Sequence, residues 1–453
     1  MRSRTTKERY FDFSGESSLK VVNAYRDKYR RISEVRDGNP RILVLAHRDL
    51  ARTRSESPGG RGGYSSEQIL RALVVMFVEQ DSYRQAVIRI ENSEFLRHFV
   101  RLGVKATMDY RFLSKAYGVI SEGTGQAINQ GLGEYARREE KIDGEKLRLD
   151  PTGVETNIHY PTDSSLRWDS FRTLARLLRG RQQDHPEWDL ARRFHVKKVK
   201  KLSYFIARNG GSPNRRKQRK VKSTYRVLIE RGGWIVGVAK EALRLAGPRD
   251  VEAVELAHDV PIVERIIDQG QRRIFDGEIV PADEKVYSLF EAHTELLKRG
   301  KAGKPVEFGH KVLVAQTKEK FIHHYTVLPR RKEDPELLDP TRKAHEDLFG
   351  QPPDLRAADQ GFYRSMDQIA EREEDISVVS IGKKGRRTPE EIARESTEAF
   401  KEGQRFRAGS EGSISGLKRA FKRGKCLFKG FKPYAACVGL AVFCHNLVLL
   451  TRL

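Results

Sequence analysis

Three acidic residues and two nearby cations are the residues of this chain best suited to do chemistry. Glu411 lies between Arg407 and Lys418 in the spacing R-x3-E-x6-K. Each helical residue advances about 100°, so Glu411 would lie about 40° from Arg407 and about 20° from Lys418. The spacing therefore predicts that all three side chains share one helix face. A carboxylate there can hold a metal ion while the cations bind phosphates, which favours phosphodiester chemistry.

Two aspartates could complete such a site. Asp150 ends a predicted strand that begins at Lys146, and a turn at 151–153 followed by the alternating segment 154–159 predicts a hairpin with Asp150 at its tip. Asp359 ends a second predicted strand, which begins at Leu355. Mg²⁺ prefers oxygen ligands, and two ions roughly 3.5–4 Å apart can activate the attacking oxygen and stabilise the leaving oxygen. Two adjacent strands with a helix packed on their sheet would bring the three acids together.

Each of these acids also has an ordinary structural interpretation. An aspartate at a strand end is commonly a turn or cap residue, and Glu411 could pair with Arg407 one turn earlier. Asp150 ranks above its neighbours because a strand end suits a site. The competing acids beside the predicted hairpin are Glu155, Asp163 and Asp169. The histidines that could suggest a softer metal site lack convergent spacing and are predicted to be surface or strand residues. They are His159, His310, His323 and His324.

The charge of the chain predicts a polyanionic partner. Its 453 residues carry 86 Lys and Arg against 62 Asp and Glu, a net charge of +24. This excess favours nucleic acid, with a ribosomal or membrane surface as the alternatives. Two basic runs follow one another in the middle of the chain, where a solvated helix face is the ordinary interpretation and DNA phosphate contact the favoured one. Their candidate phosphate-binding residues are Lys197, Lys198, Lys200, Arg215, Arg216, Lys217, Arg219 and Lys220.

The remaining composition indicates a cytoplasmic protein. Three cysteines late in the chain have no CxxC spacing, so neither a disulfide framework nor a zinc finger is expected. The first residues lack the apolar core of a signal peptide. The apolar stretch 435–450 is interrupted by His445 and Asn446 and predicts a buried C-terminal helix, so no membrane partner is expected.

Periodicity suggests three parts. A basic segment covers 1–62 and ends in a glycine-rich break at 59–63. Residues 63–138 contain a helix start at Ser65 and several short helices, which fit a helix-turn-helix DNA-binding domain or an ordinary helical bundle. Residues 139–453 alternate strands and helices, interrupted by a basic, mostly helical insertion at about 162–300.

These segments resemble the DDE transposases of bacterial insertion sequences. The segment 149–163 is similar to the first-aspartate segment of one branch of these enzymes, and residues 359–362 are similar to the family's D-x-G-[F/Y]. Arg407, Glu411 and Lys418 match the last three members of the family's Y-x2-R-x3-E-x6-K signature. Gln404 occupies the tyrosine position, which is a departure from the pattern.

The resemblance implies an α/β fold: an RNase H-like mixed sheet flanked by helices, with an all-α N-terminal domain. Asp150, Asp359 and Glu411 would hold two Mg²⁺ ions, for which Mn²⁺ could substitute, and Arg407 and Lys418 would contact phosphates. The enzyme would cut double-stranded DNA at transposon ends and join the freed 3′-hydroxyl to target DNA. It would be bacterial and nucleoid-associated, and a homodimer or larger when DNA is bound. The alternatives are a stand-alone nuclease on the same fold and a non-catalytic DNA-binding derivative.

Overall fold

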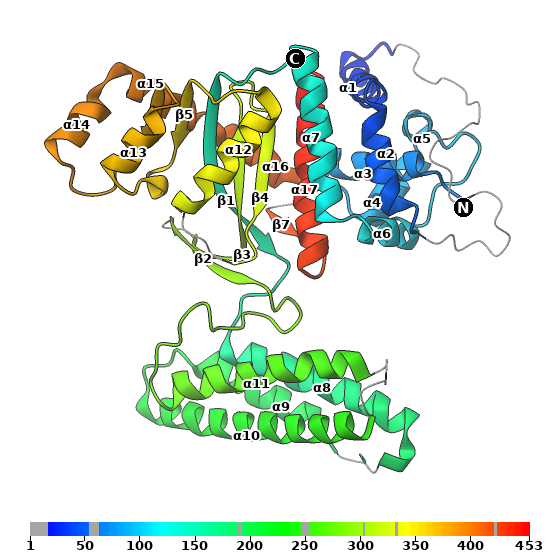
Figure 1. The fold of residues 1–453 in the computed structure, drawn as a ribbon. Helices are drawn as coiled ribbons and strands as arrows, with labels where there is room; N and C mark the ends of the chain where they lie inside the picture. The colour runs from blue at the N-terminus through cyan, green and yellow to red at the C-terminus, as the bar shows by residue number, and fades with distance from the viewer. Residues whose placement is uncertain are drawn as a thin grey trace. The chain divides into compact units, whose positions relative to one another are not determined.

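The chain divides into two compact units (Figure 1). The computed structural model describes residues 17–53, 63–188, 190, 193–246, 250, 253–301, 304–330, 334–420 and 424–453. The first unit comprises Met1–Thr156 and His310–Leu453, and the second comprises Asn157–Gly309. The glycine-rich break predicted at 59–63 lies, apart from Gly63, outside the described residues.

A mixed sheet, to which the second unit contributes residues 295–301 and 304–309, is the framework of the first unit. The prediction of a mixed α/β fold is confirmed. The strand order is β2-β3-β1-β5-β6, with β4 pairing with β3 and β7 pairing with β1. Strand β1 is parallel to β5 and β7, β5 is parallel to β6, and β3 is antiparallel to β2 and β4. The strands are β1 (Lys146–Thr156), β2 (Glu295–Lys301), β3 (Lys304–Gln316), β4 (Ile322–Val327), β5 (Leu355–Ala358), β6 (Val378–Ile381) and β7 (Lys425–Cys426).

Strand β1 is one continuous strand, so the predicted hairpin with Asp150 at its tip is wrong. The predicted turn residues 151–153 stay within the strand. On this side β1 pairs with β5 through 146–148 and with β7 through 155–156, so 151–153 lie between the two ladders. Pro151 lies between these two ladders, where its missing N–H is tolerated. Asp150 is consequently a mid-strand residue rather than a strand-end residue.

Helices cover both faces of this sheet. Leu147 and Leu149 of β1 point into one apolar cluster, which also contains Leu338 of α12 and Ile369 of α13. The intervening residues of β1 face the other layer, because side chains alternate along a strand. The helices that follow the sheet strands are η3 (Asp334–Leu337), α12 (Leu338–Phe349), η4 (Gln360–Phe362), α13 (Met366–Glu373), α14 (Pro389–Ser396), α15 (Glu398–Ala408), α16 (Ser410–Ala420) and α17 (Phe431–Leu450).

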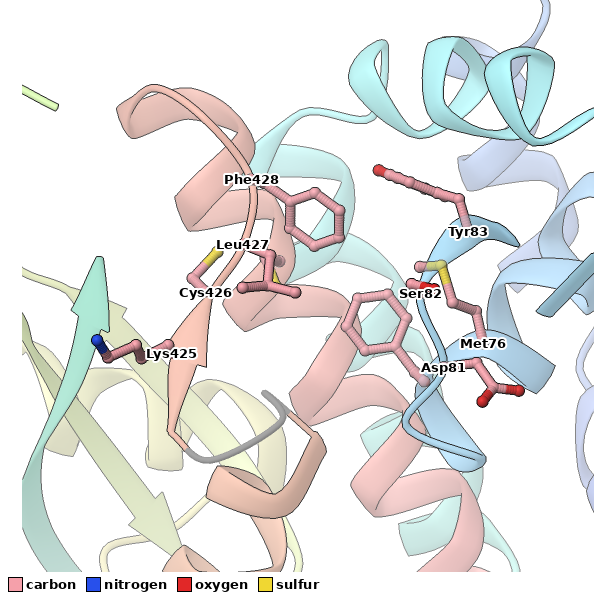
Figure 2. Close-up of a pocket in the computed structure, with 10 residues that line it drawn as sticks. Met76, Asp81, Ser82, Tyr83, Lys425, Cys426, Leu427 and Phe428 are labelled. Carbon is pink, nitrogen blue, oxygen red and sulfur yellow. The ribbon is translucent and has the colours of Figure 1, made fainter. Parts of the chain in front are cut away.

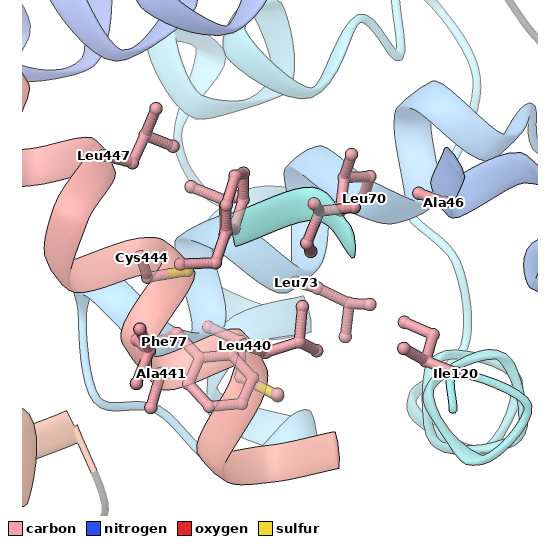
Figure 3. Close-up of a cluster of buried hydrophobic side chains, with 14 of the residues drawn as sticks. Ala46, Leu70, Leu73, Phe77, Ile120, Leu440, Ala441, Cys444 and Leu447 are labelled. Carbon is pink, nitrogen blue, oxygen red and sulfur yellow. The ribbon is translucent and has the colours of Figure 1, made fainter. Parts of the chain in front are cut away.

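A second apolar cluster joins the N-terminal helices to α17 (Figure 3). Leu70, Leu73 and Phe77 of α3 lie in the same cluster as Leu440 and Leu447 of α17. Helices α7 and α17 approach closely at Gly125 and Gly439, since a Cβ at Gly439 would lie 3.1 Å from the Gly125 Cα. The N-terminal helices are α1 (Lys20–Asp37), α2 (Pro40–Leu50), α3 (Ser66–Val78), α4 (Tyr83–Glu91), α5 (Glu94–Val100), α6 (Tyr110–Gly118) and α7 (Glu122–Arg138).

The local start signals act as the sequence predicts. Ser65 caps α3 in a capping box with Gln68, and Thr388 caps α14 in the same way with Pro389 in the first turn. The predicted C-terminal helix is α17, which is buried over most of its length. Helix α17 is also long and apolar enough to cross a membrane, but 78% of its apolar window is buried inside the protein.

Four helices form the core of the second unit. They pack around one apolar cluster that includes Leu174 of α8, Ile206 of α9, Leu228 of α10 and Val263 of α11. The elements are α8 (Asp163–Asp184), η1 (Pro186–Trp188), α9 (Val196–Asn209), α10 (Arg215–Ala246) and α11 (Val254–Ile274). This unit spans most of the segment where the sequence predicts a basic helical insertion.

Candidate metal and phosphate site

Asp150 faces the layer formed by α15 and α16. Its carboxylate Oδ2 accepts a hydrogen bond of 2.6 Å from the Ser410 hydroxyl. Ser410 is the first residue of α16 and is buried. The bond therefore fixes the beginning of α16 beside the middle of β1.

Asp359 lies immediately after β5 and level with Asp150. Lys146 is opposite Leu355 and Arg148 is opposite Ala357 in the parallel ladder. Continuing the same register by two residues places Asp359 opposite Asp150, on a neighbouring strand path about 4.8 Å away. Asp359 is exposed, and its carboxylate caps η4 by accepting the Gln360 N–H at 2.8 Å. A register continued in this way would place two of the three predicted acids on neighbouring strand paths.

The third acid follows directly after Ser410. Glu411 is the second residue of α16, and its side chain lies outside the described part of the chain. Its backbone is nevertheless fixed one residue from the bond between Ser410 and Asp150. Asp150, Asp359 and Glu411 thus come from two adjacent strand paths and from a helix held against one of them. Their role as ligands of two metal ions stays a prediction.

Arg407 and Glu411 lie on two helices, so the prediction of a single helix face shared by Arg407, Glu411 and Lys418 is wrong. Arg407 belongs to α15, which ends at Ala408, whereas Glu411 and Lys418 lie two turns apart on α16. The break is at Gly409. A Cβ there would lie 2.8 Å from Nη1 of Arg148, so the β1 side chain occupies the space that any other residue at 409 would need.

Arg148 is a site residue that the sequence analysis missed. Its Nη1 donates to the Phe406 carbonyl at 3.0 Å, its Nε donates to the Gln316 Oε1 at 3.0 Å, and its guanidinium lies 5.0 Å from the Phe406 ring. Burial lowers the pKa of Arg148 to about 10, an effect that the nearby Asp150 charge opposes. Arg148 therefore stays protonated at neutral pH and holds the end of α15 against β1. The sequence gives one signal for Arg148: it lies two residues before Asp150, so both side chains lie on the same face of the strand.

Gln404, at the position of the signature tyrosine, connects β6 to Arg407. Its Nε2 donates to the Ser380 carbonyl at 2.8 Å and to the Ser380 Oγ at 3.0 Å. Its Oε1 accepts a hydrogen bond of 3.3 Å from Nε of Arg407. Gln404 therefore takes part in the hydrogen bonds that orient Arg407.

The competing acids have partners of their own. Asp163 binds Arg273 at 2.5 Å, and Asp169 binds Arg172 at 2.8 Å and His159 at 3.3 Å, all within the second unit. Glu155 lies 3.7 Å from Lys425.

Three histidines of the sheet strands have hydrogen-bond or ring partners within the protein. His310 bonds the Leu328 carbonyl, His324 bonds Thr326, and His323 packs against the ring of His345. Among the described side chains, which do not include the Glu411 carboxylate, no group of three His, Cys, Asp or Glu residues is arranged to hold a metal ion.

The predicted phosphate-binding cations of the basic runs lie on α9 and at the start of α10. All eight are exposed, and none is paired with a described carboxylate. Residues 193–229 contain 13 Lys and Arg and no Asp or Glu. This segment therefore supplies more than half of the net charge of +24, and all of its cations except Arg193 lie on α9 and α10. Its DNA-binding role, and that of 63–138, stay predictions.

Comparison of the chain with protein-family models, with curated proteins and with solved structures finds no match. The functional interpretation therefore rests on the geometry around Asp150.

Proposed function

We propose that this protein is a Mg²⁺-dependent DDE transposase whose mixed sheet is of the RNase H-like type. The observation that carries the proposal is the hydrogen bond between Asp150 and Ser410. It is taken with the β1–β5 ladder, whose register would set Asp359 opposite Asp150 if it continued two residues beyond Arg148 and Ala357. Together they would bring two carboxylates and the residue before Glu411 to one place.

The donor set suits magnesium. Asp150, Asp359 and Glu411 offer hard oxygen ligands, and the exposed Asp359 leaves room for the waters that Mg²⁺ retains. These three residues would hold two ions, and the ions when bound would lower the cost of charge on the attacking and leaving oxygens. Ser410 would orient the Asp150 carboxylate, and Arg148 would keep α15 in place beside it.

The reaction would proceed by two in-line displacements. In the first, a water oxygen bonds to the phosphorus at a transposon end, and the bond from phosphorus to the 3′-oxygen breaks, which leaves a 3′-hydroxyl. In the second, that hydroxyl bonds to a phosphorus of target DNA and displaces the target 3′-oxygen. Arg407 and Lys418 would bind the phosphates, and Gln404 would hold Arg407 in position.

A plasmid assay tests this proposal. The substrate is a supercoiled plasmid that carries the DNA flanking the gene for this chain, incubated with Mg²⁺ or Mn²⁺. We expect nicking and joining by the wild type, and a loss of at least about 100-fold in Asp150→Asn, Asp359→Asn and Glu411→Gln, since even outer-shell changes cost 10–100-fold at metal sites. Asp367→Asn, an exposed carboxylate on α13, is the matched control.

The outcomes separate the three function classes. Nicking without joining identifies a nuclease on the same fold. DNA binding with neither step identifies a non-catalytic derivative. Full activity in both Asp359→Asn and Glu411→Gln would overturn the three-carboxylate site.

A further inference from the structure

A basic loop follows β6 at the edge of the sheet where Asp359 lies. Ala358 of β5 is opposite Ile381 of β6 in the parallel ladder, so Asp359 and Gly382 are the next residues on two adjacent strand paths. Such paths lie about 4.8 Å apart. Residues 382–388, the β6–α14 loop, connect β6 to α14 and contain four Lys and Arg and no Asp or Glu. The loop therefore begins beside one of the proposed metal ligands.

The outer two cations of the β6–α14 loop hold it against α14. Nζ of Lys383 lies 2.9 Å from the Glu391 carboxylate, and the Lys383 backbone N–H donates to Oε1 of Glu395 at 2.8 Å. Nε of Arg387 lies 2.8 Å from Oε2 of Glu395. The Thr388 N–H donates to Oε2 of Glu391 at 2.7 Å. Two carboxylates of one helix therefore fix both ends of the loop.

Helix α14 is itself tied to the sheet and to the segment that follows β5. Arg394 of α14 donates from Nη1 to the Val379 carbonyl at 2.9 Å and from Nη2 to the Ile381 carbonyl at 2.6 Å. The Tyr363 hydroxyl, from the segment after β5, donates to the Glu391 carboxylate. The loop, β6 and the segment that contains Asp359 are thus joined by direct hydrogen bonds.

The inner two cations of the loop have no countercharge among the described residues. Lys384 and Arg386 are exposed, and neither forms a hydrogen bond or an ion pair with a described residue. Gly385, which separates them, has a φ of +87°, a value that favours glycine, and a Cβ there would meet no atom within 4 Å. The remaining acid in the first turn of α14, Glu390, pairs with neither cation. Two unpaired cations therefore lie at the tip of a fixed loop.

Lys425 of β7 is another cation of the sheet and differs from the two tip cations. It borders a pocket of about 160 Å³ beside Phe428 (Figure 2). The pocket is lined mainly by apolar side chains, and Nζ of Lys425 lies 3.7 Å from a carboxylate oxygen of Glu155. Lys425 is thus balanced within the protein, whereas the two tip cations are available to a ligand.

Phosphodiester groups suit these two side chains. A guanidinium can donate two parallel hydrogen bonds to the oxygens of one phosphate, and an ammonium binds phosphate as a point charge. Because Lys383 and Arg387 already fix the ends of the loop, little backbone freedom is lost when the tip binds a ligand. A DNA strand also fits the position, since a strand with one phosphate at the metal site presents the neighbouring phosphates beside it.

We propose that Lys384 and Arg386 bind two backbone phosphates of the DNA strand that is cut, and so position its scissile phosphate at Asp359. The inference rests on the proposed function, which makes DNA the substrate. Lys384 is two residues beyond Gly382 and hence at most about 7 Å from it, which places it within about 12 Å of Asp359. Phosphates of one strand recur about every 3.4 Å along the DNA axis. The bound phosphates should therefore lie within about four positions of the bond that is cut.

The test compares three double variants after the nick that the wild type makes in the flanking DNA has been mapped. The tip variant is Lys384→Gln/Arg386→Gln, and the charge-conserving variant is Lys384→Arg/Arg386→Lys. The control variant removes two exposed cations elsewhere in the same unit and is Arg48→Gln/Lys343→Gln. The kcat and KM for nicking of a duplex that contains the mapped position are measured with Mg²⁺ at several salt concentrations. Circular dichroism checks that all variants fold.

We expect the tip variant to have a raised KM and a shallower plot of log KM against log[salt]. Loss of two phosphate contacts should lower the slope by about 1.8, which corresponds to a rise in KM of up to about 60-fold at 0.1 M salt. The charge-conserving variant should keep the wild-type slope, because the slope depends on the number of cations that bind phosphate. The control variant should leave the slope and KM nearly unchanged.

Neutral methylphosphonates, placed one at a time on either side of the nick, locate the contact. At a phosphate that the tip binds, this replacement should weaken nicking by the wild type but should not weaken the tip variant further. Additive effects at all of the roughly four positions on each side would overturn the inference, as would a charge-conserving variant as impaired as the tip variant. Nicking that depends on Asp150, with KM and slope unchanged in the tip variant, refutes this inference alone. Absence of nicking by the wild type refutes the proposed function together with it.

Discussion

Replacing Gly403 by alanine should separate α15 from β6 and so release Arg407. Gly403 is buried where α15 lies against β6, and a Cβ at this position would be 2.3 Å from the Ser380 Cβ and 2.7 Å from its Oγ. Carbon atoms in contact lie about 3.5–4.0 Å apart, so the helix must move outward by about 1 Å. Gln404 then loses its bonds of 2.8 and 3.0 Å to Ser380, because both would exceed hydrogen-bonding distance.

The expected cost of this substitution is about 2–3 kcal/mol of unfolding free energy. Overpacking of a fitted contact costs about 1–3 kcal/mol, and each hydrogen bond that breaks costs about 0.5–1.5 kcal/mol. The higher helix propensity of alanine relative to glycine offsets about 0.8–1 kcal/mol of this cost. Because the clash joins two carbon atoms close to the backbone, no rotation of the Ser380 side chain can relieve it.

Urea unfolding can assign this destabilisation to the correct unit. All three tryptophans, Trp168, Trp188 and Trp234, lie in the second unit, so tryptophan fluorescence follows that unit only. Far-UV circular dichroism follows both units. We expect Gly403→Ala to lower the urea midpoint of the dichroism transition by about 1 M and to leave the fluorescence transition unchanged. Amide exchange should accelerate in peptides from 376–408.

A second substitution gives the refuting result. Ser380→Gly removes the two atoms that clash, so the double variant with Gly403→Ala should be about 1–2 kcal/mol more stable than the sum of the single effects predicts. Strict additivity would refute the close-contact reasoning. Gly118→Ala, at the end of α6 with no atom within 4 Å of the added Cβ, is the control and should be close to neutral.

Three further predictions concern the site, the core and the basic helices. Ser410→Ala should raise the Mg²⁺ concentration needed for half-maximal nicking by about 10–100-fold, because it removes the bond that orients Asp150, and an unchanged Mg²⁺ titration would contradict this role. Burial lowers the pKa of His345 to about 4, so the unfolded chain gains a proton first as pH falls from about 6.5 to 4, and His345 alone lowers the stability by about 3 kcal/mol across that window. His345→Gln should reduce the pH slope in urea unfolding by this amount, and the remaining slope comes from His323, His324 and His445, whose pKa values burial also lowers. Neutralising part of the α10 basic run should weaken duplex binding and flatten its salt dependence, and an unchanged salt slope would exclude contact there. The residues to change to glutamine together are Lys217, Arg219 and Lys220.

Local signals in the sequence are enough to predict most helices and strands. The capping box of Ser65 and Gln68 and the start of α14 at Pro389 depend only on residues within one turn. The strand at 355–358 is predictable from its apolar run, and the acid that follows it lies at its end as expected. These features can be predicted because each one is decided by neighbours in the chain.

The hairpin at 146–159 could not be corrected from the sequence, because its outcome depends on distant strands. Pro151 and Gly153 form a strong local turn signal. The strand continues past them because β7, some 270 residues later, pairs with Glu155 and Thr156. Pairing with a distant strand overrides the local preference for a turn, and the sequence of residues 146–159 does not indicate that pairing.

The break at Gly409 has the same origin. The spacing of Arg407, Glu411 and Lys418 is compatible with one helix, and nothing nearby in the sequence forbids it. The interruption follows from the Arg148 guanidinium, which bonds the Phe406 carbonyl and fills the space beside Gly409. The acids could be predicted from their types and spacing, whereas the residues that hold them in place could not.

Gln404 links Arg407 to the sheet through both ends of its amide. An amide carries both a donor and an acceptor, and here the donor binds Ser380 of β6 while the acceptor receives the Arg407 Nε–H. Arg407 is therefore tied to the sheet through one side chain, and Asp150 is tied to α16 through Ser410. Arg148 joins the end of α15 to β1 between these points. A phosphate bound at Arg407 and a metal bound at Asp150 would thus be held by two strands of the same sheet, and in-line phosphodiester chemistry requires such a fixed relation between them.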